Sequence, residues 1–237
     1  GVTGVQTCAL PILTLGTHLL DLMIFFFGDP VGVRAELYTG GAPALKSERT
    51  KTVEEIGPCA GEELFAEFRF ANGVRGTFES RRGLFHYDGG MQTNMGLSVT
   101  GTKGILSERF TDGLPDDPVR ICRTPYPAEY GVPFELFPVQ ETRTVPGAVP
   151  MDDFVRTVPG IPHTQFFIGA NHFAAWDLIR AIEEDRLPVS NIYNARKTLE
   201  MIYGIYASHL KAGARVEFPL RNREHPLESE PGEESSR

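Results

Sequence analysis

The sequence EELFAEFRFANGVRGTFES, residues 62–80, carries the strongest structural signal in the chain. Apolar and polar side chains alternate on both sides of Asn72-Gly73, the dipeptide most typical of a tight β-hairpin turn. The pattern therefore predicts two antiparallel strands, over residues 62–70 and 74–80.

Further strands are predicted before and after this hairpin. Residues 31–37 show the same alternation, and residues 96–100 and 105–110 flank a Gly-Thr-Lys-Gly turn that favours a second hairpin. Ten of the eighteen prolines lie between residues 111 and 165, so this part predicts only edge strands and loops.

A helix is predicted ahead of the first strand. Residues 14–27, TLGTHLLDLMIFFF, are apolar around most of a helical circumference, so we expect most of this helix to be buried. Gly28 and Pro30 are the stop signals that usually follow the last turn. His18 and Asp21 interrupt the apolar surface, and their spacing of three places them on one face.

Two more helices are predicted near the end of the chain. The first covers residues 166–185, and the second begins at a cap, Ser190 or Asn194, and ends at Gly213. A closing strand follows at residues 215–220. Each helix has an expected inward stripe: Ala170, Phe173, Ala174, Leu178, Ala181 and Ile182 in the first, and Leu199, Ile202, Ile205 and Tyr206 in the second.

Hairpins combined with helices predict an α+β fold, a mostly antiparallel β-sheet with helices packed on one face. The open face of the sheet would need a cover, because a broad exposed apolar face is a liability. A second copy of the chain is the simplest cover, so we expect a homo-oligomer through the open sheet face.

The composition indicates a soluble protein without nucleic-acid or membrane partners. The 237 residues carry a net charge of −8, from 31 acidic and 23 basic residues, and no basic stripe that would attract a nucleic acid. Its longest apolar run, residues 19–27, is far shorter than the ~20 residues of a membrane span. Three scattered cysteines favour a reducing compartment, and we expect a cytoplasmic location.

The two ends of the chain are set apart from this domain, which we expect over residues 13–227. Residues 2–12, VTGVQTCALPI, are identified as the conceptual translation of a common sequencing-adapter oligonucleotide, the alternative being a genuine irregular arm. We therefore treat residues 1–12 as an artefact and expect the natural chain to begin further upstream. Residues 228–237 are rich in Glu and Ser and predict a disordered acidic tail.

The usual cofactor and metal motifs are missing from the sequence. No GxGxxG, GxxxxGK[ST] or GxSxG pattern occurs, and the six histidines show neither HxH nor HExxH spacing, so no metal site is expected. His18 is the sharpest candidate for chemistry, because an imidazole can carry the proton of a substrate hydroxyl. By spacing alone, a core histidine partnered by Asp21 is the stronger interpretation.

A second group of polar residues follows the main hairpin, in SRRGLFHYDGG, residues 80–90. Arginines including Arg82, together with Tyr87, would suit a polyhydroxylated ligand, although a solvated loop has the same composition. His172, near the start of a predicted helix, could face a cleft, although such residues more often face water.

Several motifs, in order, resemble the Gfo/Idh/MocA oxidoreductases, over about residues 13–227. The first is GTHLLD at residues 16–21, followed by Gly-Asp-Pro at residues 28–30. The others are the Asn72-Gly73 hairpin, Ser80-Arg81-Arg82 with Tyr87-Asp88, VTGTKG at residues 99–104, ARKTLEMIYGIYASHLKAGARVEFP at residues 195–219 and REHPL at residues 223–227.

This resemblance implies a two-domain enzyme whose N-terminal Rossmann domain, with a Glu-Lys-Pro lysine, binds NAD or NADP. That domain is absent from this sequence, so we expect this fragment to be inactive. The resemblance places the catalytic histidine at His18, and it implies that Arg82 and Tyr87 lie near the hydroxyls of a sugar or polyol substrate. We also expect Thr14 and His172 among the substrate-binding residues. It also implies an oligomer formed through the sheet.

One position departs from the family pattern. The family often carries an aspartate four residues before its histidine, where this chain has Thr14, and a threonine cannot act as a general base at neutral pH. The alternative functions are therefore a non-catalytic sugar-binding or dimerisation module, or an unrelated α+β ligand-binding domain.

Overall fold

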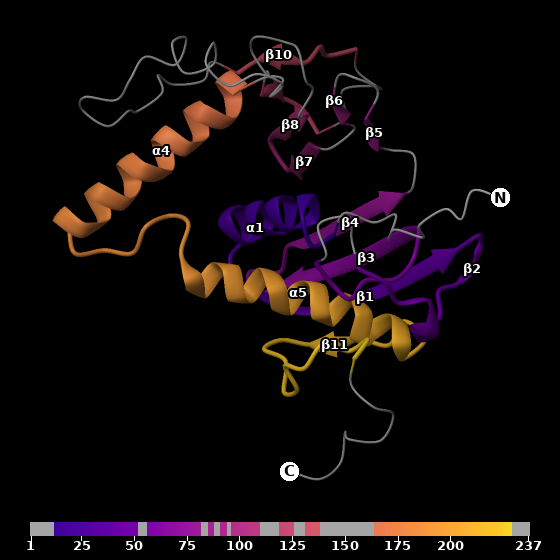
Figure 1. The fold of residues 1–237 in the computed structure, drawn as a ribbon. Helices are drawn as coiled ribbons and strands as arrows, with labels where there is room; N and C mark the ends of the chain where they lie inside the picture. The colour runs from indigo at the N-terminus through magenta and orange to yellow at the C-terminus, as the bar shows by residue number, and fades with distance from the viewer. Residues whose placement is uncertain are drawn as a thin grey trace. The chain divides into compact units, whose positions relative to one another are not determined.

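The computed structural model describes residues 12–51, 56–81, 85–87, 91–93, 96–109, 119–125, 131–137 and 164–228. The chain divides into two compact units, the first formed by residues 1–83 and 192–237 and the second by residues 84–191 (Figure 1). Every strand pairing in both units is antiparallel, which confirms the predicted α+β fold.

The first unit is built on a five-stranded sheet. Its strands run in the order β11-β1-β3-β4, and β2 also pairs with β1. Their bounds are Pro30–Thr39 for β1, Ala42–Pro43 for β2, Glu63–Phe70 for β3, Arg75–Arg81 for β4 and Val216–Glu217 for β11. A short 3-10 helix, η1, covers Lys46–Glu48 between β2 and β3.

The predicted hairpin at residues 62–80 is confirmed as β3 and β4. Leu64 pairs with Ser80 and Phe68 with Gly76. The four buried residues of β3, which lie on one face of the sheet, are Leu64, Ala66, Phe68 and Phe70. In the turn, the Asn72 side chain accepts a hydrogen bond from the Val74 backbone N–H at 3.1 Å. The same side chain donates to the Phe27 carbonyl at 3.1 Å, so the turn also holds the end of the first helix.

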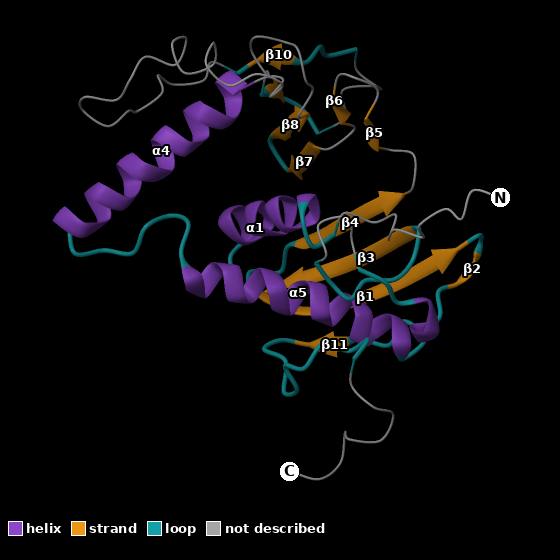
Figure 2. Ribbon diagram, viewed as in Figure 1, coloured by secondary structure: helices purple, strands orange, loops and turns teal. Residues whose placement is uncertain are grey.

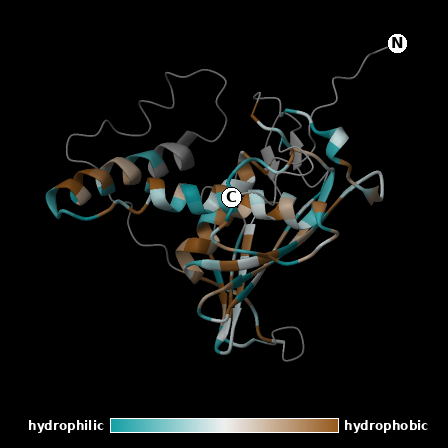
Figure 3. Ribbon diagram, turned by 90° about the horizontal axis from the view of Figure 1, so that it is seen from below, coloured by the Kyte–Doolittle hydropathy of each residue, from teal (hydrophilic) through white to brown (hydrophobic). Residues whose placement is uncertain are grey.

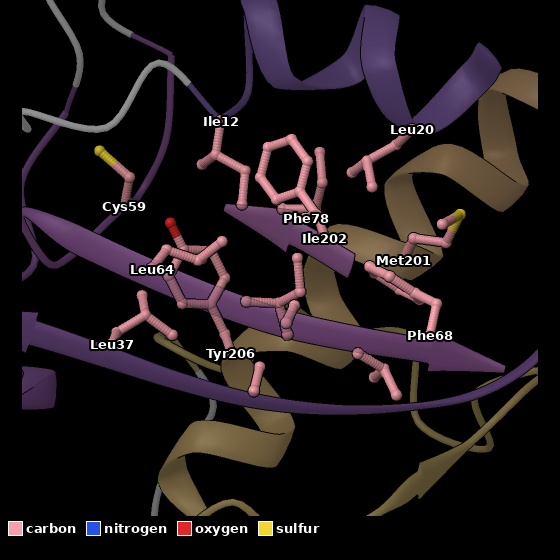
Figure 4. Packing of buried hydrophobic residues seen from close by; sticks show 14 of the residues in the cluster. Ile12, Leu20, Leu37, Cys59, Leu64, Phe68, Phe78, Met201, Ile202 and Tyr206 are labelled. Carbon is pink, nitrogen blue, oxygen red and sulfur yellow. The ribbon is translucent and has the colours of Figure 1, made fainter. Parts of the chain in front are cut away.

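Two helices lie along one face of this sheet, as predicted: α1, Leu15–Phe27, and α5, Ile192–Leu210 (Figures 1 and 2). The core lies between the helices and the sheet (Figure 4). Its fully buried side chains include Leu20 from α1, Leu37, Leu64 and Phe68 from the strands, and Met201, Ile202, Ile205 and Tyr206 from α5. Ile12, the last residue of the segment interpreted as adapter sequence, is also in this core.

The stop signal of α1 is confirmed, but the expectation that most of the helix is buried is wrong, since its buried residues are Gly16, Leu20, Met23 and Ile24. Gly28 ends the helix at φ +79°, and its N–H donates to the Ile24 carbonyl at 2.8 Å. Phe25 and Phe26, however, are 62% and 47% exposed, because α1 forms the outer layer and only one face of it meets the core. Leu199 in α5 is exposed at 41% for the same reason, although Ile202, Ile205 and Tyr206 are buried as predicted.

The opposite face of the sheet is charged rather than apolar, which corrects the premise of the predicted cover. Exposed side chains on this face come from alternate positions of three strands, and one large apolar residue, Phe65, is among them at 48% exposure. The remaining exposed members are Arg34, Glu36, Glu63, Arg69, Arg75, Thr77, Glu79 and Arg81. Charged side chains can remain in contact with water, so the sheet does not require a second chain to cover this face.

Side chains from α5 complete the outer edge of β1, between the short strands β11 and β2. The Ser208 hydroxyl accepts from the Ala35 N–H at 2.9 Å and donates to the Ala214 carbonyl at 2.7 Å. His209 Nδ1 accepts from the Leu37 N–H at 3.1 Å, and its Nε2 lies 2.7 Å from the Ala44 carbonyl. Backbone groups that would be left at a bare strand edge are therefore satisfied by a helix.

The segment that follows α5 begins with a turn at Gly213 and then contacts the Glu200 side chain of the helix. Gly213, at φ +75°, follows the last turn as predicted, and its N–H donates to the Ser208 carbonyl at 2.9 Å. The Glu200 carboxylate accepts from the Leu220 N–H at 3.2 Å and lies 3.2 Å from Arg223 Nε.

The second unit contains two small sheets and a long helix. The two-stranded sheet pairs β5, Phe85–Tyr87, with β6, Met91–Thr93. The other sheet has the order β10-β9-β8-β7, with bounds Glu135–Leu136 for β10, Arg120–Cys122 for β9, Gly104–Arg109 for β8 and Gly96–Gly101 for β7. The predicted second hairpin is thus confirmed as β7 and β8.

The long helix of this unit, α4, covers Thr164–Glu183, close to the predicted bounds. Its predicted inward stripe is only partly buried: Ala181 is 3% exposed, whereas Leu178 and Ile182 are 51% and 73% exposed. Figure 3 shows hydrophobic and hydrophilic positions interleaved along this helix, at the left of the view. Periodicity predicts that the segment is a helix with an apolar face, but it does not indicate which part of the protein packs against that face.

Within the described part of the chain, none of the helices combines the length and the hydrophobicity that crossing a membrane would require.

Candidate functional site

The N-terminal turn of α1 presents Thr14 and His18 together. Thr14 is the residue before the first helical position, and its carbonyl accepts a hydrogen bond from the Thr17 hydroxyl. His18 lies one turn further along and is exposed. The interpretation of His18 as a buried core histidine is therefore wrong, because the ring occupies the outer face of a helix whose other side meets the core.

Gly16 is a packing position of the core rather than a ligand contact. It is buried, and a Cβ at this position would lie 3.3 Å from atoms of both Ile12 and Phe78. The missing side chain allows α1 to approach β4 closely at the turn that carries His18. The backbone that presents the imidazole is therefore fixed by packing.

Asp21 lies between His18 and helix α5. The carboxyl is half-buried, and burial raises its pKa above the ordinary value, while the charge of His18 and a hydrogen bond with the Thr198 side chain lower it. Thr198 is 4% exposed on α5. The three residues therefore form one electrostatically connected cluster across the α1–α5 contact.

The other expected binding residues lie outside the described residues or in the second compact unit. Arg82 lies outside the described residues. Tyr87 is the last residue of β5, where it pairs with Met91, and His172 is a partly buried residue of α4. Tyr87 and His172 thus belong to the second compact unit, whereas Thr14 and His18 belong to the first.

Sequence reasoning missed the partners that α5 supplies. Thr198 lies beside Asp21, and Ser208 and His209 bind the backbone of β1, although these residues are more than 170 positions from their partners. His225 was also passed over, yet it is 8% exposed and lies against the rings of Tyr203 and Tyr206 at 4.7 and 5.5 Å. Motifs of the sequence include these residues but do not indicate their partners, because each pairing depends on how α5 crosses the sheet.

Across the residues that the structure describes, no group of three or more His, Cys, Asp or Glu side chains lies where it could hold a metal ion.

The comparisons with known proteins agree on one fold. Residues 8–107 match the sequence model described as the GFO/IDH/MocA C-terminal domain. None of the curated proteins matches the chain.

Several solved structures share this fold. Levoglucosan dehydrogenase in complex with NADH and levoglucosan is 20% identical, with a TM-score of 0.53 over 87% of this chain and 49% of that one. An NAD binding oxidoreductase from Klebsiella pneumoniae is 16% identical, with a TM-score of 0.55 over 85% and 49% of the two chains. An aldose-aldose oxidoreductase from Caulobacter crescentus, complexed with glycerol, is 18% identical, with a TM-score of 0.50 over 85% and 45%.

At these low identities the structural similarity indicates a shared fold and nothing more. The chain spans about half the length of the structures that it matches. The sequence match covers α1 with His18 and the hairpin of β3 and β4. Over residues 8–107 this chain is therefore similar to the C-terminal domain of the GFO/IDH/MocA proteins.

Proposed function

We propose that this chain is the substrate domain of an oxidoreductase that transfers a hydride between a sugar- or cyclitol-like hydroxyl carbon and NAD or NADP. The observation that carries the proposal is His18, exposed on a rigidly packed helix within the region that matches the family. A general acid–base residue must reach its substrate, and an exposed imidazole on a fixed backbone meets that requirement.

The proposed role of His18 is to hold the reacting hydroxyl and to exchange its proton. During oxidation the proton moves from the substrate oxygen to an imidazole nitrogen, and in the reverse direction His18 returns it. The nicotinamide supplies the hydride chemistry when it is bound, and the protein supplies orientation. The chain contains no dinucleotide-binding fingerprint, so we assign that binding to a domain N-terminal to it.

Substrate recognition is assigned to Thr14, Arg82, Tyr87 and His172. A hydroxyl, a guanidinium, a phenol and an imidazole can all hydrogen-bond to sugar or polyol oxygens. The solved complexes with levoglucosan, L-sorbose and glycerol support a polyhydroxylated substrate class. Residues 13–227 would form this domain, located in the cytoplasm, with residues 1–12 an artefact and residues 228–237 a tail.

We also assign a homo-oligomeric state, formed through the open face of the sheet. Because that face is charged, two copies would associate by matching opposite charges around Phe65 rather than by burying a broad apolar surface. Arg34 opposite Glu67, and Glu63 opposite Arg81, already place both signs side by side.

The test uses the intact protein, with its natural upstream sequence, and a panel of sugars and cyclitols with NAD and NADP. His18→Asn should lower kcat by about 10²- to 10⁴-fold, the usual worth of a general acid–base residue. Its unfolding free energy should change by less than about 0.5 kcal/mol, because the side chain is exposed. Arg120→Gln, at an exposed position of β9, is the matched control and should retain wild-type kcat.

Two results would contradict the proposal. One is full activity in His18→Asn, which would remove the proton-carrying role. The other is an upstream reading frame without a dinucleotide-binding unit, which would favour the non-catalytic sugar-binding or dimerisation module, in line with Thr14 at the position of the family's acid. The 237-residue chain assayed alone should show no NAD-dependent sugar oxidation.

A further inference from the structure

We propose that residues 220–228 form a strap that His225 holds against helix α5, and that protonation of the imidazole releases this strap. The strap belongs to the first compact unit. Its release is independent of the role proposed for His18, and it gives a function to a buried histidine that the proposed reaction does not use.

The strap is attached to the core at its two ends. Leu220 is 8% exposed and Leu227 is 1% exposed, and Leu227 belongs to the hydrophobic core cluster. The residues between them, 221–224, are all exposed. The position of the strap therefore depends on the contacts that each end makes.

The first end is held by an ion-pair cluster. The Glu200 carboxylate of α5 accepts a hydrogen bond from the Leu220 N–H at 3.2 Å and lies 3.2 Å from Arg223 Nε. Arg196 Nε lies 3.9 Å from the same carboxylate. No histidine takes part in these contacts, so this end differs in chemistry from the other.

The second end is held by His225. Its Nδ1 accepts a hydrogen bond from the Leu227 N–H at 3.2 Å, and its carbonyl accepts from the Glu228 N–H at 2.8 Å. The ring centre lies 4.7 Å from that of Tyr203 and 5.5 Å from that of Tyr206, both on α5. The imidazole thus joins the helix to the turn that places Leu227 in the core.

The hydrogen bond at Nδ1 specifies a neutral ring. An imidazole that accepts at Nδ1 carries its one hydrogen on Nε2, whereas an imidazolium has two donors and no acceptor. Protonation therefore puts a hydrogen on Nδ1, where it opposes the Leu227 N–H. The Nε2 atom is buried and makes no hydrogen bond of normal geometry to the described residues, so the positive charge would be poorly solvated.

The groups that face His225 do not offset this cost. Tyr203 is an uncharged phenol, and burial raises its pKa above the ordinary value. The Glu228 charge and the Pro58 backbone favour the protonated ring, but burial outweighs them and lowers the pKa of His225. Arg223, on the strap itself, is paired with Glu200. Acid therefore weakens the second attachment and leaves the first in place.

Backbone hydrogen exchange of the 237-residue chain, followed by nuclear magnetic resonance at pH 7.5 and pH 5, tests the release. The protection factor of the Leu227 amide should fall at least about threefold between these pH values, and at most about 30-fold, the limit for one group with an ordinary pKa of about 6.5. At pH 5 it should be at least about tenfold lower than that of the Ala35 amide, which donates to the Ser208 hydroxyl, because the strap opens while the sheet stays folded.

His225→Asn is the test variant. Its side-chain oxygen can accept from the N–H two residues further on, as in an Asx turn, but it does not titrate, so the protection factor of Leu227 should change by less than about twofold between the two pH values. His209→Asn is the matched control, because the Nδ1 of His209 also accepts a backbone N–H, that of Leu37. This control should keep the wild-type pH dependence at Leu227.

An equal pH dependence in wild type and His225→Asn would overturn the proposal. Equal protection of the Leu227 and Ala35 amides at pH 5 would also overturn it, since the strap would then open only when the whole unit unfolds. If His225→Asn does not fold, long-range ¹⁵N–¹H spectra of the wild type carry the test. They should show the Nε2–H tautomer of His225 at pH 7.5, and an Nδ1–H tautomer would contradict the proposed attachment.

Discussion

At the scale of single residues, His225 shows how burial changes the chemistry of a side chain. Its Nδ1 accepts a hydrogen bond from the Leu227 N–H at 3.2 Å, and its ring lies between Tyr203 and Tyr206. Its Nε2 is buried and makes no hydrogen bond of normal geometry to the described residues. Burial lowers the pKa of His225, against the opposing effects of the Glu228 charge and the Pro58 backbone.

This pKa shift predicts a stability that depends on pH. The unfolded chain takes up the His225 proton below about pH 6.5, and the folded chain takes it up only at a lower pH. The unfolding free energy should therefore be highest above pH 6.5 and fall as the pH decreases, with a slope of at most about 1.4 kcal/mol per pH unit from this residue. Urea unfolding between pH 5 and 7.5 measures it.

His225→Asn provides the comparison, because its side-chain oxygen can still accept from Leu227 but does not titrate. The loss of stability toward low pH should be smaller in this variant than in the wild type. Identical pH curves for wild type and His225→Asn would exclude His225 as the source.

At the scale of elements, helix α5 holds the sheet together as well as covering it. Ser208, which is fully buried, joins β1 to the segment before β11 through the Ala35 N–H and the Ala214 carbonyl. Gly204 allows the same helix to approach the sheet, since a Cβ there would lie 2.5 Å from the Phe218 ring. The edge of β1 thus depends on the C-terminal half of α5.

Ser208→Ala tests this dependence. It leaves the buried Ala35 N–H and the Ala214 carbonyl without their side-chain partner, and the loss at the buried N–H should lower the unfolding free energy by about 1–3 kcal/mol. The measurement is urea unfolding, with Ser190→Ala as the control at an exposed position; the control should change stability by less than about 0.5 kcal/mol. A loss in Ser208→Ala no larger than in Ser190→Ala would show that water or movement of the backbone satisfies these groups.

At the scale of the whole molecule, the charged face of the sheet makes the proposed oligomer sensitive to salt. Exposed charges separated by more than a few ångströms are screened as ionic strength rises. Sedimentation velocity should therefore show weaker association in 500 mM than in 50 mM NaCl. Phe65→Glu should reduce association further, because it places an unpaired charge at the centre of the face, whereas Leu136→Glu, exposed on β10, should not. A monomer at both salt concentrations would contradict the oligomer.

The sequence alone predicted the three helices and the main hairpins, but not η1 or the short strands β2, β5 and β6. Alternation around Asn72-Gly73 and around residues 101–104 specified both hairpins, and Gly28 and Gly213 marked two helix ends, because turn and cap geometry depends on a few neighbouring residues. The exposure of His18, Phe25 and the strand face could not be predicted in this way, since periodicity reveals that a face is apolar and not what lies against it.

Only the tertiary structure decided which distant residues meet. Thr198 reaches Asp21, and Ser208 reaches Ala35, because α5 returns across the sheet after more than a hundred intervening residues. Such contacts depend on the crossing of packed layers, and no local pattern encodes that crossing. The sequence determined that His18 lies on a helix with Asp21 on the same face. The packing of α1 against β4 and α5 determined that the imidazole faces outward and its carboxyl partner inward.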